Sequence, residues 1–406
     1  MKKILAFILS FVLLFSSMAG CSKSSGNKTQ DPPSSSSQST TQNDENSGSN
    51  VIRDSYNDLE GADVMILKMT GVLQYQLFYE GFNQEFGVLL GTHKTADLSP
   101  AEAVITDQVK AIDEAIASKV ASISVGPTGG TGYDEVLKKA DKAGIPIFSI
   151  DAPVSPEYRV AHINQADAMD VGAYLIASAI LISQRMEYDS QSGTTVVEQA
   201  HEVMEHFTGD KITIGILSTT VDAPVQNSWI LGIEEELKNE VYGGKIETEI
   251  KYTNDDLQNA AVQINAFISE GKVDSFLSLT ANASVVVGQV LASADTDLKA
   301  TGVGMPSQQA AYMPSSPGDD PFDYPMPWVL MWDPINVGRV LAAAIEANKT
   351  GDYTGEIGGT LVVPASEGYK EATYTTTEHS DGGPEIIAGP PLIFDKTNIG
   401  EWKDKF

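Results

Sequence analysis

Short apolar runs alternate with longer segments of helical periodicity along most of this chain, and no other feature constrains its fold as strongly. The apolar runs have the length and the bounding turn residues of buried strands. They span residues 63–68, 86–91, 120–125, 145–151, 159–164, 211–217, 245–252, 274–279, 300–305 and 328–333. Helical periodicity is clearest over residues 100–118, 133–144, 257–271 and 282–295. This alternation predicts an α/β fold whose parallel sheets are built from strand–helix–strand units.

The number of expected strands, about ten, exceeds the usual size of one open sheet. We therefore expect two doubly wound lobes with a ligand cleft between them. Residues 187–207 interrupt the alternation with a polar stretch that contains glycine and serine, and they are expected to form a surface insertion.

The N-terminus has the order of a secretory signal peptide. Two lysines precede an apolar run over residues 4–15, and small residues then lead to Cys21. At about 1.5 Å per helical residue the run spans roughly 18 Å, which is short of a bilayer core of about 30 Å. We expect residues 1–20 to be a signal peptide, and residues 21–58 to be a disordered tether rich in Ser, Asn and Gln.

Cys21 is the single cysteine of the chain. A lone cysteine can be a nucleophile, a redox sensor, a buried small side chain or an attachment point. It cannot form an internal disulfide, so the folded body must be stabilised by its apolar core.

The charge balance is strongly acidic, with 26 Lys and Arg against 55 Asp and Glu and a formal net charge of −29. Such a surface repels nucleic acid and offers no basic patch to acidic lipids. Nucleic-acid binding is therefore excluded from the expected functions.

Motifs for catalysis and for cofactors are weak. The histidines of "HEVMEH" (201–206) are five positions apart, about 140° around a helix, so both cannot face one metal ion as an i, i+4 pair would. The glycine-rich stretch 126–132 lacks the Lys-Ser/Thr of a phosphate-binding loop, and no G-x-S-x-G nucleophile motif occurs. We expect no enzyme activity, no metal and no cofactor.

Binding residues are expected where loops follow the carboxyl ends of the strands. Lys68 and Asp151 end two predicted strands, and Tyr75 is expected in a strand-to-helix loop, where it could stack on a sugar ring. Thr131 lies in the glycine-rich loop, and Trp332 ends an apolar strand, where it could pack in the core, line the cleft or do both. Phe78 and Phe82 have the spacing of core residues. This mixture suits a polar, largely uncharged small molecule.

From residue 63 onward, the chain resembles the type I periplasmic solute-binding proteins of sugar ABC transporters, in particular the autoinducer-2-binding and rhamnose-binding branch. The resemblance rests on "ILKMTGVLQY", "IPIFSIDAPVSPEYRVAHINQADAMDVG", "VQNSW", "TGVGMPSQ", "LMWDPINVG" and "LIFDKTNIGEW". It implies two α/β lobes joined by three hinge crossovers, near Asn164, Asp333 and Gly389. The implied N-terminal lobe comprises residues 59–164 and 334–388, and the implied C-terminal lobe comprises residues 165–333 and 389–406.

Several ligand contacts of the autoinducer-2 branch match this sequence. The lysine of that branch falls on Lys68, the glutamine on Gln226 and the alanine on Ala281. Asp151 matches the strand-end aspartate that contacts sugar hydroxyls in related ribose-type proteins.

Other contacts of that branch are replaced here. Its two aspartates fall on Thr131 and Val225, and its proline falls on Leu279. The replacement of both carboxylates removes the acceptors that would hold a polyhydroxylated furanose.

The segment "SMAGC" resembles a bacterial lipobox, which implies a lipid on Cys21 and a protein anchored outside the cytoplasm. The resemblance implies a monomeric lipoprotein that captures a sugar-like small molecule and delivers it to an ABC transporter permease. The alternatives are an autoinducer-2-type signal-binding protein and a sensory receptor that presents its closed form to a membrane kinase or chemoreceptor.

Overall fold

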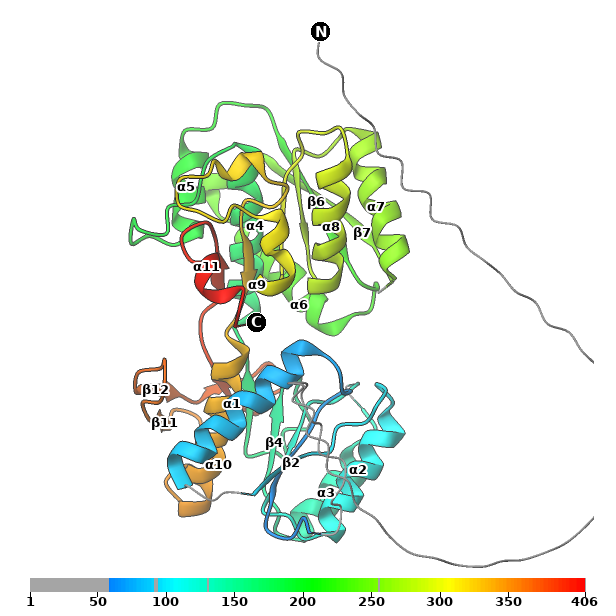
Figure 1. Ribbon diagram of the computed structural model, residues 1–406, viewed down its shortest axis with the longest axis vertical. Coiled ribbons are helices and arrows are strands. Elements are labelled where there is room, and N and C mark those ends of the chain that lie inside the picture. Colours follow the sequence, from blue (N-terminus) through cyan, green and yellow to red (C-terminus); the bar gives the residue numbers. More distant parts are fainter. Residues whose placement is uncertain (1–57, 91–93, 130, 255, 406) are drawn as a thin grey trace, which may run out of the picture. The chain divides into compact units, whose positions relative to one another are not determined.

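The computed structural model describes residues 58–90, 94–129, 131–254 and 256–405, which contain two parallel β-sheets flanked by helices (Figure 1). The first sheet is parallel throughout, except that one short strand at its edge is antiparallel. In spatial order its strands are β2 (Thr95–Asp97), β1 (Asp63–Ile66), β3 (Ser122–Val125), β4 (Ile147–Ile150), β5 (Ala161–Asn164), β14 (Pro384–Ile387) and β13 (Thr377–Glu378). Every residue of β1, β3 and β4 is buried, as expected for a sheet that is covered on both faces. We call this sheet and its helices the N-terminal lobe.

Two long helices of this lobe, α1 (Leu73–Leu90) and α10 (Pro334–Thr350), pack side by side (Figure 1). Glycines permit their close approach, because a Cβ atom on Gly81 would lie 1.9 Å from the carbonyl oxygen of Ile335. A Cβ atom on Gly338 would likewise lie 2.0 Å from the carbonyl oxygen of Phe78. Helices α2 (Ile105–Ala117) and α3 (Asp134–Lys142) complete the lobe and enclose a separate apolar cluster.

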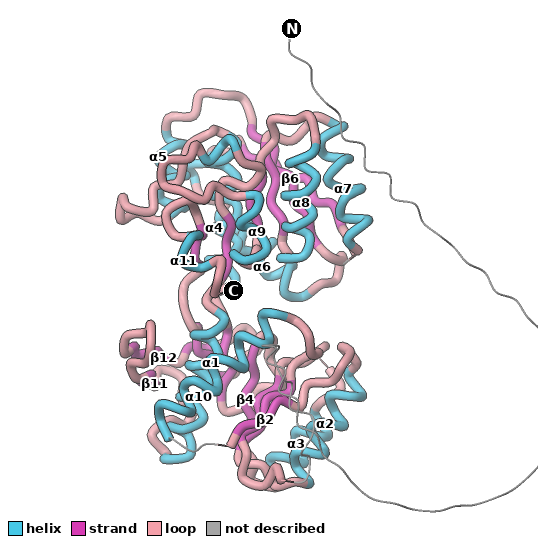
Figure 2. The backbone as a smooth tube through the Cα atoms, in the orientation of Figure 1, coloured by secondary structure: helices cyan, strands magenta, loops and turns pink. Residues whose placement is uncertain are grey.

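The second sheet and its helices form the C-terminal lobe (Figure 2). Its parallel strands, in spatial order, are β7 (Ile246–Tyr252), β6 (Ile212–Ser218), β8 (Ser275–Ser278) and β9 (Ala300–Gly302). A parallel bridge between Val303 and Leu330 joins β9 to β10 (Val329–Met331), which pairs antiparallel with β15 (Leu392–Phe394). Its helices are α4 (Ala168–Ser183), α5 (Val196–Glu205), α6 (Pro224–Glu236), α7 (Leu257–Glu270), α8 (Ala281–Ser293), α9 (Pro306–Gln309) and α11 (Ile399–Trp402).

The chain passes between the two sheets at three places: after β5, between β10 and α10, and between β14 and β15. A hairpin of β11 (Thr360–Val363) and β12 (Ala372–Thr375) lies between α10 and β13 in the sequence. The predicted α/β class with parallel sheets is confirmed.

Three local predictions were wrong. Residues 86–91 are not a strand: the chain is helical through Leu90, and β2 follows instead at Thr95–Asp97. The apolar run continues a helix face on which Phe82 and Phe86 are buried, and periodicity alone does not separate a short strand from such a face. Tyr75 accordingly lies in the first turn of α1 rather than in a loop.

The third correction concerns residues 187–207, which are more than a polar insertion. They contain α5, which begins with a capping box formed by Thr195 and Glu198. Its buried side chains Val196, Ala200 and Met204 pack into the core of the C-terminal lobe.

The predicted signal peptide, Cys21 and almost all of the predicted tether lie outside the described residues. Within the described residues, no helix has both the length and the apolar character needed to cross a membrane.

Candidate functional site

Asp151 occupies the carboxyl end of β4 in a left-handed backbone conformation, with φ of +69°. Lys68 follows β1, two strands away in the same sheet, and its Nζ lies 2.7 Å from Asp151 Oδ2. Asp tolerates the left-handed region better than most residues, and this conformation accompanies the salt bridge to Lys68. The two strand ends thus bring together the two charged residues predicted from the sequence.

Three further polar side chains surround the Asp151 carboxylate. The Tyr75 hydroxyl lies 3.5 Å from Oδ2, and the amide nitrogens of Gln74 and Gln165 each lie 3.5 Å from Oδ1. Gln74 and Tyr75 come from the first turn of α1, and Gln165 from the first passage between the sheets. These distances exceed the usual hydrogen-bond range, so ligand hydroxyls could compete for the same oxygens. We call these five residues the Asp151 cluster.

The Asp151 cluster is largely buried: 10% of the Asp151 side chain and 26% of the Lys68 side chain are exposed. The Asp151 carboxylate raises the pKa of Lys68 far above its usual value and outweighs the opposing effect of burial. Burial, followed by the charge of Asp151, raises the pKa of Tyr75. Lys68 is therefore a cation and Tyr75 a neutral donor at physiological pH, an arrangement that can bind hydroxyl and carbonyl groups.

Thr131 is an exposed residue of the loop after β3 and takes part in none of the contacts around Asp151. The loop is held by Gln108, whose Oε1 accepts hydrogen bonds from the Thr128 backbone nitrogen at 2.8 Å and from the Tyr133 hydroxyl at 2.5 Å. Gln108 thus ties Thr128 to Tyr133, and Thr131 is not brought into the Asp151 cluster.

The predicted site residues of the C-terminal lobe lie in segments that come after its parallel strands in the sequence. Gln226 lies in the first turn of α6, and Ala281 begins α8; both are partly buried. The Gln226 amide makes no hydrogen bond within the described part of the chain. Val225 is partly buried and Leu279, directly after β8, is fully buried, so these two positions are apolar.

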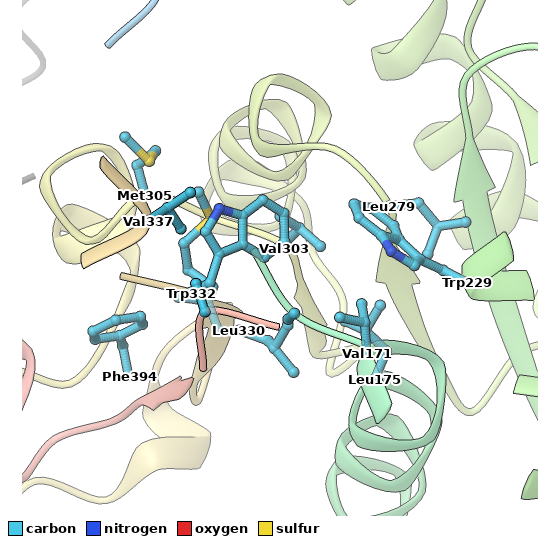
Figure 3. Close-up of a cluster of buried hydrophobic side chains, with 14 of the residues drawn as sticks. Val171, Leu175, Trp229, Leu279, Val303, Met305, Leu330, Trp332, Val337 and Phe394 are labelled. Atoms are coloured by element: carbon cyan, nitrogen blue, oxygen red, sulfur yellow. The ribbon is translucent and has the colours of Figure 1, made fainter. Parts of the chain in front are cut away.

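Trp332 lies in the core rather than on an open surface, with 3% of its area exposed. Figure 3 shows its indole near Leu330 and Val303, with Trp229 beside Leu279. The ring centroids of Trp229 and Trp332 are 5.9 Å apart. The Trp332 Nε1 donor is buried without a partner in the described structure. Of its two predicted roles, core packing is confirmed.

Sequence reasoning missed Gln74 and Gln165. Gln165 directly follows the predicted strand 159–164, so the rule that ligand residues follow strand ends could have identified it. Gln74 directly precedes Tyr75 in the expected strand-to-helix loop, so the same rule could have identified it too.

The histidine pair of "HEVMEH" does not form a metal site. His201 lies on α5 and bonds to Glu236, with Nε2 and Oε1 2.6 Å apart, whereas His206 caps the end of the helix. Within the described ranges, no group of three or more His, Cys, Asp or Glu residues could hold a metal ion.

Comparison with known proteins gives one matching family model and several similar solved structures. A family model described as a periplasmic binding protein domain matches residues 73–352. An ABC transporter solute-binding protein from Clostridium phytofermentas with bound L-rhamnose is 24% identical, with a TM-score of 0.68 over 86% of this chain and 100% of that chain. LsrB from Clostridium saccharobutylicum in complex with AI-2 is 17% identical, with a TM-score of 0.65 over 84% of this chain and 99% of that chain. A solute-binding protein from Agrobacterium vitis with bound D-fucose is 15% identical, with a TM-score of 0.59 over 85% of this chain and 99% of that chain.

Proposed function

Because this chain belongs to the periplasmic binding protein domain family, we propose that it captures a sugar outside the cytoplasm and delivers it to an ABC transporter permease. The observation that carries the proposal is the Asp151 cluster, in which a buried carboxylate is bordered by an ammonium, a phenol and two amides. A carboxylate and an ammonium can together bind adjacent hydroxyl groups of one sugar ring.

The apolar residues of the C-terminal lobe favour a sugar ring that has one hydroxyl-rich side and one apolar side. Val225 stands where the autoinducer-2 branch has an aspartate, while Leu279 and Ala281 keep the apolar character of its proline and alanine. The Asp151 cluster would bind the hydroxyl-rich side of the ring, Gln226 would add one amide contact, and Trp332 would support the apolar side. A 6-deoxyhexose has this character, and L-rhamnose and D-fucose are bound by two of the similar proteins.

We propose that the ligand is bound and released unchanged, because the family to which the chain belongs is one of binding proteins. We further propose that the protein is a monomeric lipoprotein held to the membrane by lipid on Cys21. Stable anchoring requires more than one acyl chain.

A thermal-shift panel on the mature chain with Cys21→Ser tests the sugar proposal. The probes are L-rhamnose, D-fucose, D-ribose, D-galactose, xylitol and autoinducer-2. A sugar at 100 times its dissociation constant adds about 2.7 kcal/mol to the free energy of unfolding. We expect the largest shift from a 6-deoxyhexose, and recovery of that sugar unchanged. If none of the probes shifts the melting temperature, the proposed ligand class is wrong.

A further inference from the structure

A cavity of about 400 Å³ lies beside the three passages between the sheets, and its volume is within the size range of small-molecule sites. Gln165 of the first passage, Asp333 of the second and Gly389 of the third all line it. We call this cavity the hinge pocket. Apart from Gln165, which also belongs to the Asp151 cluster, none of the residues assigned to sugar binding above lines it.

Aromatic rings from separate segments form part of its wall. Tyr369 follows the β11 strand, Tyr374 lies on β12, and Trp402 ends α11; each is partly buried. The Arg339 guanidinium lies 4.2 Å from the Tyr369 ring centroid and fixes that ring from one side. Rings that are held in place and line a concave site offer flat apolar faces to a cyclic ligand.

Most polar groups of the hinge pocket already have partners. The Tyr369 hydroxyl donates to Asp333 Oδ2 at 2.8 Å, and Asn336 Nδ2 donates to the Tyr374 hydroxyl at 3.0 Å. Arg339 donates from Nε to Glu85 Oε2 at 2.8 Å. These bonds hold the Tyr369 and Tyr374 side chains in position.

Two polar groups remain for a ligand. Gln165 lines the hinge pocket with 6% of its area exposed, and its Oε1 has no hydrogen-bond partner. The exposed Lys370 ammonium forms no ion pair within the described residues. A buried acceptor without a partner is unfavourable, so a rotation of the Gln165 amide that lets Oε1 accept from a ligand hydroxyl in the pocket would be stabilising.

The charges in the pocket favour a neutral ligand. Among the lining residues, Lys370 and Asp333 have opposite charges, and the Arg339 guanidinium is balanced by Glu85. Lys405 does not line the pocket, although its Nζ lies 4.4 Å from the Trp402 ring centroid. A neutral pyranose combines hydroxyl donors for Gln165, hydroxyl acceptors for Lys370 and a flat C–H face for the aromatic rings.

We propose that the hinge pocket is a second sugar site, distinct from the Asp151 cluster, and that its occupancy regulates sugar affinity at that cluster. The regulatory part rests on the proposed function. Gln165 connects the two sites, because its Nε2 lies 3.5 Å from Asp151 Oδ1 and the same residue lines the hinge pocket. The affinity of the hinge pocket for a ligand that contacts all three passages would also depend on the geometry of those passages. Because coupling between two binding sites is reciprocal, such a ligand would in turn change sugar affinity at the Asp151 cluster.

The test fills the pocket by Ala372→Trp. Ala372 lines the hinge pocket from β12, whereas its neighbour Thr373 points to the other side of the strand and is exposed, so Thr373→Trp is the matched control. Native mass spectrometry of the mature chain with Cys21→Ser counts bound L-rhamnose, D-fucose, D-galactose and D-glucose. We expect two sugars per chain in the parent and in Thr373→Trp, but one in Ala372→Trp.

A second variant, Asp151→Asn, weakens the other site, so at a sugar concentration that fills only the hinge pocket it should retain one sugar per chain. Sugar affinity at the Asp151 cluster should change at least about fivefold in Ala372→Trp, the lower end of typical coupling. If Ala372→Trp fails to fold, Lys370→Glu at the exposed rim of the hinge pocket replaces it in the test. This variant should weaken the binding of the second sugar.

If the parent binds one sugar per chain, and its affinity is unchanged in Ala372→Trp or Lys370→Glu, the proposal of a sugar site in the hinge pocket is overturned. The proposed function is then left intact. No sugar bound to the parent contradicts both. Two sugars in the parent, with no change in affinity at the Asp151 cluster when the pocket is filled, would retain the second site and refute its regulatory role.

Discussion

Arg339 of α10 and Glu85 of α1 form an ion pair in the interior of the N-terminal lobe, with 1% and 0% of their side chains exposed. Arg339 also donates to the Pro364 carbonyl at 2.9 Å, so it ties both long helices to the segment that follows β11. Burial raises the pKa of Glu85, and the charge of Arg339 opposes that shift. Each charge is therefore tolerated only with its partner present.

Arg339→Met should lower the free energy of unfolding by about 3–5 kcal/mol, because it leaves Glu85 charged and buried alone. The double variant Arg339→Met/Glu85→Leu should recover most of this loss. Urea denaturation of both variants measures the difference. A double variant no more stable than the single one would show that the hydrogen bond to Pro364, rather than the charge pair, is the main contribution.

Gly338 on α10 is a second determinant of the contact between α1 and α10. Gly338→Ala should destabilise the protein by about 1–3 kcal/mol, because its Cβ atom meets the rigid backbone of α1. Gly87→Ala is the matched control on α1, since a Cβ atom there has no neighbour within 4 Å. It should stabilise the helix by about 0.5–1 kcal/mol. Urea denaturation of both variants measures these changes in the free energy of unfolding, which should have opposite signs. A Gly338→Ala protein as stable as the parent would contradict the packing argument.

The sequence predicted the parallel strands well, because β1, β3 and β4 are short apolar runs bounded by turn residues. It failed at residues 86–91, where burial of Phe82 and Phe86 on α1 produces the same apolar run in a helix. The motifs that resemble sugar-binding proteins were sufficient to predict the family, which the match over residues 73–352 confirms.

The candidate site was predicted only in part. Lys68 and Asp151 could be found because each ends a strand, and strand ends of one parallel sheet converge. The hinge pocket could not be found, because Gln165, Asp333 and Tyr369 lie far apart in the sequence and meet only through the tertiary fold. The role of Gln165 in both sites likewise depends on distances that no local pattern encodes.

His162 makes stability depend on pH. It is buried on β5, with Nδ1 3.1 Å from Ser149 Oγ. Burial, and then electrostatic interaction with His379 and Arg159, lowers its pKa to about 3. The unfolded chain binds a proton below a pKa of about 6.5, whereas the folded protein does not until about pH 3. This contribution to stability is thus present above pH 6.5 and lost as the pH falls toward 3.

Between pH 7 and pH 5 the His162 contribution should fall by about 2 kcal/mol. Urea denaturation at the two pH values measures it. His162→Gln should have a flatter pH profile, and His206→Gln, at the exposed end of α5, serves as the control. If the profile of His162→Gln matched that of the parent, the pH dependence would arise elsewhere.

Cys21→Ser should release the protein from the membrane or leave its signal peptide uncleaved, with sugar affinity unchanged. The physical reason is that the serine hydroxyl cannot form the thioether that would carry lipid on Cys21. Cell fractionation with a labelled fatty acid follows the anchor, and Ser22→Ala is the neighbouring control. A Cys21→Ser protein that remained lipid-labelled and attached would contradict the proposed anchor.

Asp151→Asn tests the Asp151 cluster with little disturbance of the backbone, because Asn tolerates the left-handed conformation that Asp151 adopts at φ of +69°. The substitution removes the charged acceptor and leaves Lys68 without its partner at 2.7 Å. Sugar affinity should fall by about 1–3 kcal/mol, the cost of a lost hydrogen bond to a charged group, as measured by titration calorimetry. Asp141→Asn, on the exposed face of α3, is the matched control and should bind like the parent. Equal affinity of Asp151→Asn and the parent would place the sugar elsewhere, because a ligand bound at this carboxylate must respond to the loss of its charge.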